Sequence, residues 1–333
     1  MTAPLYRDPV FDGASDPVVV WHAERRQWWM LYTARRATAP GPGVAWVHGS
    51  DIGVAVSDDG GRSWLYRGPV QGLDVEWGRN TFWAPEVVRA EGRYHMFVSY
   101  IRGVPDQWAG HGRQIVHYTS QDLIGWEHHG PVPLGSARVI DAALHPLPGG
   151  GYRMWFKDEE HGSHTYCADS PDLEAWGPAR PALTGFEHEG PNVFRLGGRY
   201  WLIVDDWHGL RTFCSADLET WEPNGRILGA PGRRPDDQDV GRHADAVVCG
   251  GTGYLFYFTH PGLPAGGGDG SYASRRSSIQ VAQLSVHGGT LRCDRDAPFQ
   301  LELRPDEATR SDLCGGGPGR RPGPEEALRS AHR

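Results

Sequence analysis

The sequence predicts an all-β fold, a five-bladed β-propeller of four-stranded antiparallel sheets. Three observations support this prediction: a short motif that recurs along the chain, paired apolar segments of strand length before each copy, and a composition rich in turn-forming residues. The 333 residues include 46 Gly and 26 Pro, which suits strands and turns better than helices. Hydrophobic residues make up 39% of the chain, so a globally disordered protein is excluded.

The recurring motif is Ser-x-Asp-Leu-x-x-Trp, which we call the marker. It occurs at residues 120–126, 170–176 and 215–221, and a fourth copy at 57–64 carries one extra residue. Ser and Asp side chains turn the backbone by hydrogen bonding to it, while Leu can fill a core position and Trp can pack between blades. We therefore interpret the marker as architecture and not as chemistry.

Each repeat unit contains two strand-like segments separated by a turn, the first rich in β-branched residues and the second in aromatic ones. In chain order these pairs are 16–20 with 28–32, 85–88 with 94–98, 141–144 with 152–156, 189–193 with 200–204, and 245–248 with 254–258. The fifth unit adds 278–284 as a third strand and lacks the Trp marker. Each of the five units, of about 45 to 60 residues, has room for four short strands, and radial packing of such sheets makes a propeller.

The chain is predicted to form one propeller domain over residues 1–303, followed by a disordered tail over 304–333. Strand periodicity ends at this boundary, and Gly, Pro and charged residues become frequent. The stretches 231–241 and 262–270 are expected to be surface loops.

Composition also limits the partners and the location of the protein. A net charge of −8 argues against a nucleic-acid or membrane-surface partner, since both need a basic face. No apolar run is long enough for a transmembrane helix, and the first residues do not resemble a signal peptide. The five cysteines lack metal or redox spacing and are interpreted as free thiols, so a cytoplasmic location is expected.

Acidic or polar residues stand near the start of the first strand of each unit. They are Asp16, Glu86, Asp141, Glu189, and His243 with Asp245. Because innermost strands of a propeller surround its axis, we expect these side chains to meet at one mouth of the channel. Unpaired buried carboxylates are costly, so their repetition indicates a polar site. Converging carboxylates suit glycoside hydrolysis, in which one donates a proton, another activates water or attacks the anomeric carbon, and a third adjusts the pKa of the acid.

Four short motifs carry a family resemblance, which spans residues 8–292. They are Ser15-Asp16-Pro17, Trp83-Ala84-Pro85-Glu86, Ile140-Asp141 and His188-Glu189-Gly190-Pro191-Asn192. In order and spacing they resemble glycoside hydrolase family 43 and its five-bladed relatives. The resemblance implies that Asp16 is the general base, Asp141 the residue that orients the acid and modulates its pKa, and Glu189 the general acid. Ala142 and Glu86 depart from the family pattern and indicate a divergent branch.

The resemblance also bears on His243, which corresponds to a family histidine beside a central calcium ion or water cluster. His243 is therefore either a polar pocket residue or a metal ligand. No cofactor is otherwise expected, and a structural Ca²⁺ ion in the central channel remains an alternative. The pair His161 and His164 lacks the further ligands that a zinc site needs.

Several other side chains are candidates for contact with a sugar. The predicted substrate-binding set is Trp83, Glu86, Lys157, His164, His188, Trp207, Arg242 and His243, with Trp108 as a further candidate. Aromatic faces stack on sugar rings, although Trp is also ordinary core material. Lys157 is the single lysine in a chain that otherwise uses arginine, which suggests a need for a compact ammonium group. We expect it to bind a sugar hydroxyl or carboxylate, or to pair with Asp141 or Glu189.

These residues predict an enzyme that hydrolyses a glycosidic bond in a small glycan, with a carbohydrate as its partner. The resemblance favours inversion, and a retaining fructosidase-like enzyme with Asp16 as nucleophile is the alternative. A phosphorylase would need a phosphate pocket, for which Arg102, Arg113 and Arg242 are candidates. A non-catalytic carbohydrate-binding propeller is the remaining alternative, since fold alone does not determine function.

Overall fold

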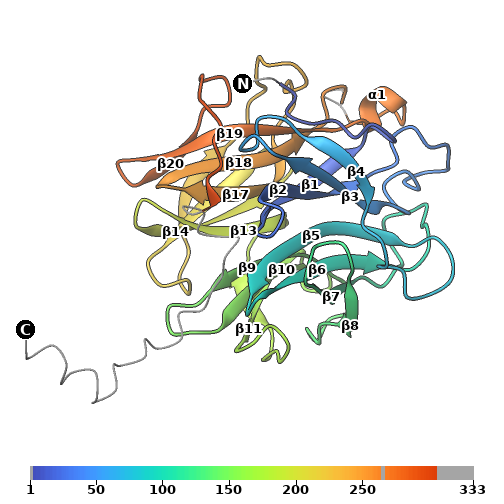
Figure 1. The fold of residues 1–333 in the computed structure, drawn as a ribbon, viewed down its shortest axis with the longest axis horizontal. Helices are drawn as coiled ribbons and strands as arrows, with labels where there is room; N and C mark the ends of the chain where they lie inside the picture. The colour runs from blue at the N-terminus through green and yellow to red at the C-terminus, as the bar shows by residue number, and fades with distance from the viewer. Residues whose placement is uncertain (1–2, 264–266, 306–333) are drawn as a thin grey trace, which may run out of the picture.

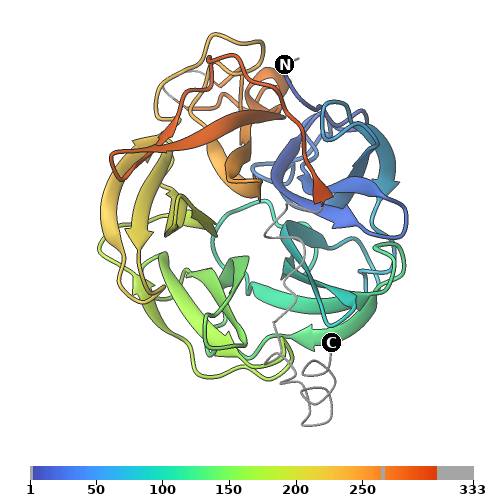
Figure 2. The same ribbon diagram turned by 60° about the vertical axis from the view of Figure 1, so that its left-hand side comes forward.

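A computed structural model describes residues 3–263 and 267–305 of the chain. Over these residues the strands form five separate four-stranded sheets arranged as a ring around a central axis (Figure 2). All neighbouring strands within a sheet are antiparallel. The predicted five-bladed propeller is therefore confirmed, and Figure 1 shows the ring from another side.

Each blade is built from four strands that follow one another in the chain. Blade 1 contains β1 (Ala14–His22), β2 (Gln27–Ala34), β3 (Asp51–Ser57) and β4 (Leu65–Pro69). Blade 2 contains β5 (Thr81–Ala90), β6 (Arg93–Ile101), β7 (Gln114–Ser120) and β8 (Glu127–Pro131). Blade 3 contains β9 (Val139–Pro146), β10 (Tyr152–Asp158), β11 (His164–Ser170) and β12 (Arg180–Leu183). Blade 4 contains β13 (Glu189–Leu196), β14 (Arg199–Asp205), β15 (Leu210–Ser215) and β16 (Glu222–Ile227).

Blade 5 contains β17 (Arg242–Cys249), β18 (Thr252–Thr259), β19 (Ser278–His287) and β20 (Thr290–Cys293), with the short helix α1 (Tyr272–Arg275) between β18 and β19. The first strand of every blade is the innermost, because these five strands contact one another around the axis. Residues near the start of each first strand therefore share one end of the central channel.

The core lies between the blades. Five clusters of buried apolar side chains each join two adjacent blades, and the cluster between blades 1 and 2 includes Val18, Leu31 and Met96. Each sheet therefore buries both of its faces. This explains why its inner strands are nearly continuous runs of apolar residues. The fold brings polar residues together mainly where the inner strands begin.

The marker connects the third strand to the fourth in blades 1 to 4. In blade 4, Ser215 Oγ accepts the amide hydrogen of Leu218 at 2.9 Å, and Asp217 Oδ1 accepts those of the next two residues. Leu218 has a φ of +67° and is buried, as are its counterparts in blades 2 and 3. Trp221 packs in the cluster between blades 3 and 4. The structural interpretation of the marker is confirmed.

The ring closes by contacts from both ends of the described chain. The backbone of Tyr6 exchanges hydrogen bonds with Ile279 of β19 at 3.1 and 2.9 Å. Leu303 donates its amide hydrogen to Gly60, and its carbonyl accepts from Trp28 Nε1. Residues near the predicted domain end at 303 thus pack on blade 1, while most of the predicted tail, 306–333, lies outside the described residues.

Three further sequence expectations can be compared with the structure. The stretch 231–241 is a loop, but it is not wholly at the surface, because Asp237 is buried and binds Tyr257 and Arg295. The cysteines within the described ranges are unpaired, and Cys314 lies outside those ranges. In the part of the chain that the structure describes, no helix has the length and apolar character needed to cross a membrane.

Candidate active site

Each innermost strand is interrupted by a β-bulge near its start. The bulge residues are Asp16, Ala84, Asp141, Gly190 and His243, at matching positions in the five blades. The first four have positive φ values between 45° and 61°. A bulge turns a side chain away from its regular direction, and Asp tolerates positive φ better than most residues. Bulges in blades 1 and 3 therefore direct carboxylates toward the axis.

Side chains of the preceding blade hold these bulges in place. The amide hydrogen of Ala84 is donated to Thr33 Oγ1 at 2.8 Å, and that of Asp141 to Ser99 Oγ at 2.9 Å. The amide of Gly190 donates to Asp141 Oδ2 at 3.0 Å. Asp141 thus performs in blade 3 the same task as Thr33 performs in blade 1, and it links its own bulge to the strand that carries Glu189.

The expectation that Glu86 occupies the position equivalent to Asp16 is wrong. Ala84 holds that position, and Glu86 lies two residues further along the strand. Glu86 Oε1 accepts the amide hydrogen of Leu144 in blade 3 at 2.8 Å, and Asp245 likewise accepts from Val19 in blade 1. Inner strands of neighbouring blades do not pair, so these buried carboxylates satisfy amide groups there. Glu86 does not line the cavity.

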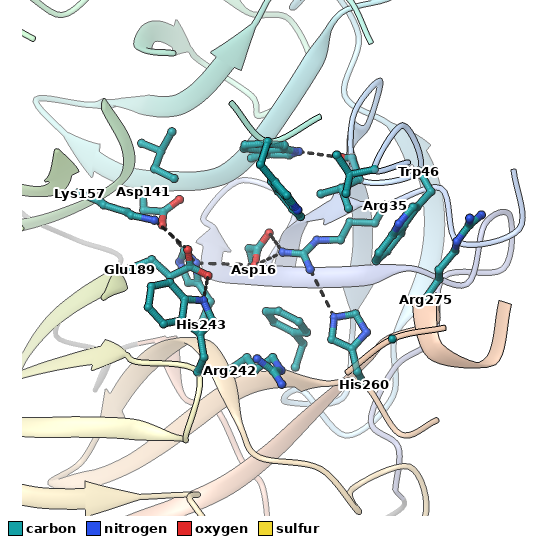
Figure 3. A pocket seen from close by; sticks show the side chains of 18 of the residues that line it. Asp16, Arg35, Trp46, Asp141, Lys157, Glu189, Arg242, His243, His260 and Arg275 are labelled. Atoms are coloured by element: carbon teal, nitrogen blue, oxygen red, sulfur yellow. Dashed lines mark hydrogen bonds and ion pairs between the residues drawn. The ribbon is translucent and has the colours of Figure 1, made fainter. Parts of the chain in front are cut away.

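A cavity of about 830 Å³ opens where the innermost strands begin (Figure 3). Asp16, Asp141 and Glu189, from three different blades, all line it. Of the predicted sugar contacts, Trp83, Lys157, Trp207, Arg242 and His243 also line it, as does Trp108. The structure therefore brings together the predicted catalytic residues and most of the predicted binding residues.

Two predicted contacts, His164 and His188, do not line the cavity. His188 is fully buried, where Nε2 accepts the amide hydrogen of Thr165 and Nδ1 donates to the carbonyl of Phe186. His164 stacks on the His188 ring with 6.4 Å between centroids. His188 therefore fixes the backbone directly before Glu189 and is a structural residue, which corrects the expectation for both histidines.

Asp16 lies in a positively charged environment. Arg35 Nη2 is 3.2 and 3.3 Å from its two carboxylate oxygens, and His243 Nδ1 is 3.7 Å away. Burial raises the pKa of Asp16, but Arg35, His243 and hydrogen bonds from Thr33 and Ser15 outweigh this effect. The pKa of Asp16 consequently lies below its ordinary value, and the group is a carboxylate at neutral pH.

Glu189 is held at both carboxylate oxygens. Lys157 Nζ donates to Oε2 at 3.1 Å and Trp207 Nε1 donates to Oε1 at 3.2 Å. Lys157 is also 3.4 Å from Glu159, and its ammonium lies 5.6 Å from the centre of the Trp207 ring. Burial raises the pKa of Glu189, but the charge and hydrogen bond of Lys157 lower it by more than burial raises it. The pKa of Glu189 therefore lies below its ordinary value. One of the two pairings expected for Lys157 is thus present.

Two neighbouring carboxyl groups shift in the opposite direction. Burial, reinforced by the charge of Glu189, raises the pKa of Asp141 to about 6. Burial and Glu189 likewise raise the pKa of Asp205, at the end of β14, to about 7. Asp205 accepts the amide hydrogens of Trp207 at 2.7 Å and His243 at 3.1 Å. In the free protein, protons therefore remain on Asp141 and Asp205 to higher pH than on Glu189.

Sequence reasoning missed Asp205 and a second group of cavity residues. The missed lining residues include Arg35, Trp46, Arg138, Glu159, Phe258, His260 and Arg275. Most lie on the connections β2–β3 and β18–β19, at residues 35–50 and 260–277, which are much longer than the four-residue β14–β15 connection. Unusual loop length was the available signal, since long loops in compact domains often carry functional residues.

The arginines proposed for a phosphate pocket are not assembled as expected. Arg102 is 82% exposed, pairs with Glu76 and does not line the cavity. Arg113 and Arg242 line the cavity, but Arg113 is held by Glu159 at 2.6 Å and Arg242 by Asp239 at 3.3 Å. The three arginines therefore do not converge on one phosphate pocket, as the phosphorylase alternative would require.

A metal at His243 does not fit the side chains around it. Over residues 3–263 and 267–305, no group of three or more His, Cys, Asp or Glu side chains is arranged to hold a metal ion. The carboxylates nearest His243 are already bound, Asp16 by Arg35 and Asp141 by the amide of Gly190.

Comparison with known proteins gives structural neighbours only. No protein-family model matches the chain, and no curated protein matches its sequence. A thermostable family-43 glycoside hydrolase superposes with a TM-score of 0.68 at 17% identity, covering 90% of this chain and 99% of that one. CoXyl43, a GH43 β-xylosidase/α-arabinofuranosidase from a compost microbial metagenome in complex with xylotriose, gives 0.64 at 16% identity, covering 90% and 98%.

A GH43_1 enzyme from Xanthomonas citri complexed with xylotriose gives a TM-score of 0.64 at 17% identity, covering 90% of this chain and 96% of that one. The chain therefore has a propeller like that of family-43 glycoside hydrolases, and identities this low agree with a divergent branch. They show the fold, so the activity has to be argued from the site itself.

Proposed function

We propose that this protein is a glycoside hydrolase that cleaves a glycosidic bond in a small glycan, with inversion at the anomeric carbon. The observation that carries the proposal is the convergence of Asp16, Asp141 and Glu189 from three blades in one cavity, with proton affinities shifted in opposite directions. The pKa of Asp141 is raised, while those of Asp16 and Glu189 are lowered, so Asp141 holds a proton to higher pH than the two residues assigned below as base and acid. The cavity also has the volume of a small-molecule site.

Asp16 is assigned as the general base. Its lowered pKa keeps it ionised at neutral pH, and Arg35 and Ser15 fix its orientation. In the proposed step a water oxygen attacks the anomeric carbon while Asp16 takes a proton from that water. The bond between the anomeric carbon and the leaving oxygen breaks at the same time.

Glu189 is assigned as the general acid that protonates the leaving oxygen. It must receive a proton first, because Lys157 favours its ionised form in the free protein. Asp141 and Asp205 retain protons up to about pH 6 and 7 and are the nearest candidates to supply one. In the catalytically competent state, one proton is therefore shared among Asp141, Glu189 and Asp205, which we call the carboxyl cluster. Asp16 is ionised in the same state.

The test is a panel of aryl glycosides and oligosaccharides, with proton NMR of the first anomer released. Xylo-oligosaccharides are its first members because two of the solved neighbours are complexes with xylotriose. We expect hydrolysis that releases the inverted anomer and is lost in Asp16→Asn and Glu189→Gln. Asp58→Asn is the matched control, since this exposed carboxylate on blade 1 binds Gln27 and lies outside the cavity. Release of the retained anomer would instead make Asp16 a nucleophile.

A second candidate function, carbohydrate binding without catalysis, is favoured by one observation. Lys157 holds Glu189 in the ionised state, which is the wrong state for a proton donor. On this alternative the whole panel stays uncleaved, while Asp16→Asn and Glu189→Gln still bind the same glycans in calorimetry. Turnover of any member of the panel by the unaltered protein excludes it.

A further inference from the structure

We propose that one end of the cavity binds the negatively charged group of an acidic sugar, either a carboxylate or a sulfate ester. This end, the arginine end, consists of Arg35, Arg242, Arg275, His260 and Trp46. The proposal rests on the function proposed above and names the substrate class: a glycan with a charged substituent on the sugar at or next to the cleaved bond. Neutral glycans would then be poorer substrates.

The arginine end is a distinct part of the cavity. Arg35 follows β2, Arg242 begins β17 and Arg275 ends α1, so three separate segments contribute a guanidinium group. Figure 3 shows Arg35, Trp46, His260 and Arg275 on the side of Asp16 that faces away from Glu189 and Lys157. These four side chains and the carboxyl cluster thus lie on opposite sides of Asp16, and Arg242 lies between them beside His243.

Positive charge at this end exceeds what the protein itself neutralises. Among the residues that the structure describes, Arg275 has no carboxylate partner, and its Nη1 donates to the carbonyl of Ala39 at 3.4 Å. The Nε–H groups of Arg275 and Arg35 are buried without an acceptor in the described chain. Buried donors without acceptors are unfavourable, and guanidinium groups are among the most costly. These donors indicate an acceptor that comes with the ligand.

His260 orients Arg35 without adding charge. Its Nδ1–H donates to the carbonyl of Arg276 at 3.0 Å, which leaves Nε2 as an acceptor 3.5 Å from Arg35 Nη1. Burial, together with the charges of Arg35 and Arg242, lowers the pKa of His260 to about 3. Since His260 stays neutral, it holds the Arg35 guanidinium in place and is a positioning residue.

The guanidinium groups of the arginine end suit an anionic substituent better than a hydroxyl. Trp46 helps to hold one of them, since the Arg275 guanidinium lies over its ring, 5.8 Å from the ring centre. A planar guanidinium matches the two oxygens of a carboxylate or sulfate with paired hydrogen bonds, which a lone hydroxyl cannot do. The net charge of the chain is −8, so a basic cavity end is not a consequence of a basic protein. An anionic sugar satisfies both the charge and the unpaired donors.

Matched substrates test the proposal directly. One arm compares oligosaccharides of glucuronic or galacturonic acid with their carboxyl-reduced counterparts, which differ only in the charged group. A second arm compares sulfated with desulfated oligosaccharides, and a third adds inorganic phosphate to neutral substrates. We expect a kcat/KM at least roughly tenfold higher for the charged member of one pair, the size of one charge-assisted hydrogen bond.

The variant Arg275→Gln assigns that preference to the arginine end. We expect the ratio of kcat/KM for the charged over the neutral member to fall roughly tenfold, as one charge-assisted contact is lost. Arg67→Gln is the control, because this exposed arginine of β4 removes the same charge outside the cavity and leaves the ratio unchanged. An undiminished ratio in Arg275→Gln overturns the assignment.

The outcomes separate this proposal from the proposed function. Binding of acidic but not neutral oligosaccharides to Glu189→Gln by calorimetry, with no hydrolysis by the unaltered protein, supports the arginine end and removes the hydrolase proposal. Equal hydrolysis of charged and neutral pairs supports the hydrolase and overturns the arginine end. Cleavage of neutral substrates that depends on phosphate also overturns it, since the anion would then be a co-substrate.

Discussion

The marker turns between the outer strands and the bulges of the innermost strands recur in the same sheets, but only the turns recur in sequence. Blades 2 to 4 share Ser-x-Asp-Leu-x-x-Trp, and in all three the Asp Oδ1 accepts the amide hydrogens of the two residues after Leu. The bulges recur in all blades, yet they hold Asp16, Ala84, Asp141, Gly190 and His243.

This difference follows from the surroundings of each feature. The marker turns of blades 2 to 4 each pack against the neighbouring blade, so the same buried Leu and half-buried Trp serve in all three. The bulges surround a single cavity, in which each blade faces a different part of a ligand. Repetition of sequence thus accompanies stability in this protein, and divergence at a repeated position accompanies the proposed chemistry.

The largest expected effect is on catalysis, from a change at a bulge. Asp16→Asn keeps the side-chain volume but cannot accept a proton from water, so kcat falls by roughly 10²- to 10⁴-fold. Thermal unfolding is expected to change little. A melting temperature that falls together with kcat would contradict the comparison, because the bulge would then be a stability element. Asp58→Asn serves again as the exposed control.

A change at a marker turn has the reverse signature. Leu218→Ala removes a buried side chain at the boundary of blades 3 and 4, which lowers the free energy of unfolding by about 2–5 kcal/mol. Urea denaturation measures this loss, with Leu65→Ala as a control because Leu65 is 61% exposed. Unchanged stability, or a large loss of kcat in protein that is still folded, would remove the distinction between the two features.

Glu86 sharpens the comparison, since it lies on an inner strand but outside the cavity. Glu86→Ala leaves the amide of Leu144 without this acceptor and should lower the free energy of unfolding by about 1–3 kcal/mol. KM is expected to stay constant. Glu127→Ala, at an exposed position of β8, is the control. A raised KM with normal stability would restore Glu86 as a sugar contact.

The smallest effect concerns the pH profile. Activity needs a proton in the cluster of Asp141, Glu189 and Asp205, so kcat/KM should fall as pH rises through about 6 to 7, the pKa values of Asp141 and Asp205. Asp205→Asn removes a negative charge that favours protonation of its neighbours. We expect the alkaline limb to move to lower pH by roughly half a unit or more. An unmoved limb would exclude Asp205 from the proton-holding group.

Asp205 also affects how the free energy of unfolding depends on pH. The direction is opposite to that of a carboxylate in an ordinary ion pair, whose pKa is lowered by folding. The folded-state pKa of Asp205 is raised to about 7, so folding binds its proton more tightly, and the stability from this group is present at low pH and lost as pH rises toward 7. Asp205→Asn should therefore flatten the decline in unfolding free energy between pH 4 and 8, measured by denaturant titration.

The sequence by itself determined the five blades, their strand pairs and the architectural role of the marker. These are local properties: runs of β-branched and aromatic residues between turns define strands, and Ser and Asp beside a turn satisfy its amides wherever the motif occurs. The residues Asp16, Asp141 and Glu189 could also be identified, because repeated acidic side chains at the start of apolar strands indicate a polar site, although the same signal also selected Glu86, which accepts an amide hydrogen between blades.

Only the tertiary structure decided which acidic residues face the cavity and what surrounds them. Glu86 and Asp16 both stand near the start of an innermost strand, but the matching bulges align Asp16 with Ala84. Glu86 lies two residues further along its strand and is an inter-blade acceptor, not a cavity residue. Arg35, His260 and Arg275 come from segments far apart in the chain, and their meeting depends on ring closure that pairs blade 5 with blade 1. The proton distribution among Asp141, Glu189 and Asp205 likewise depends on burial and on distances to Lys157, which no spacing along the chain encodes.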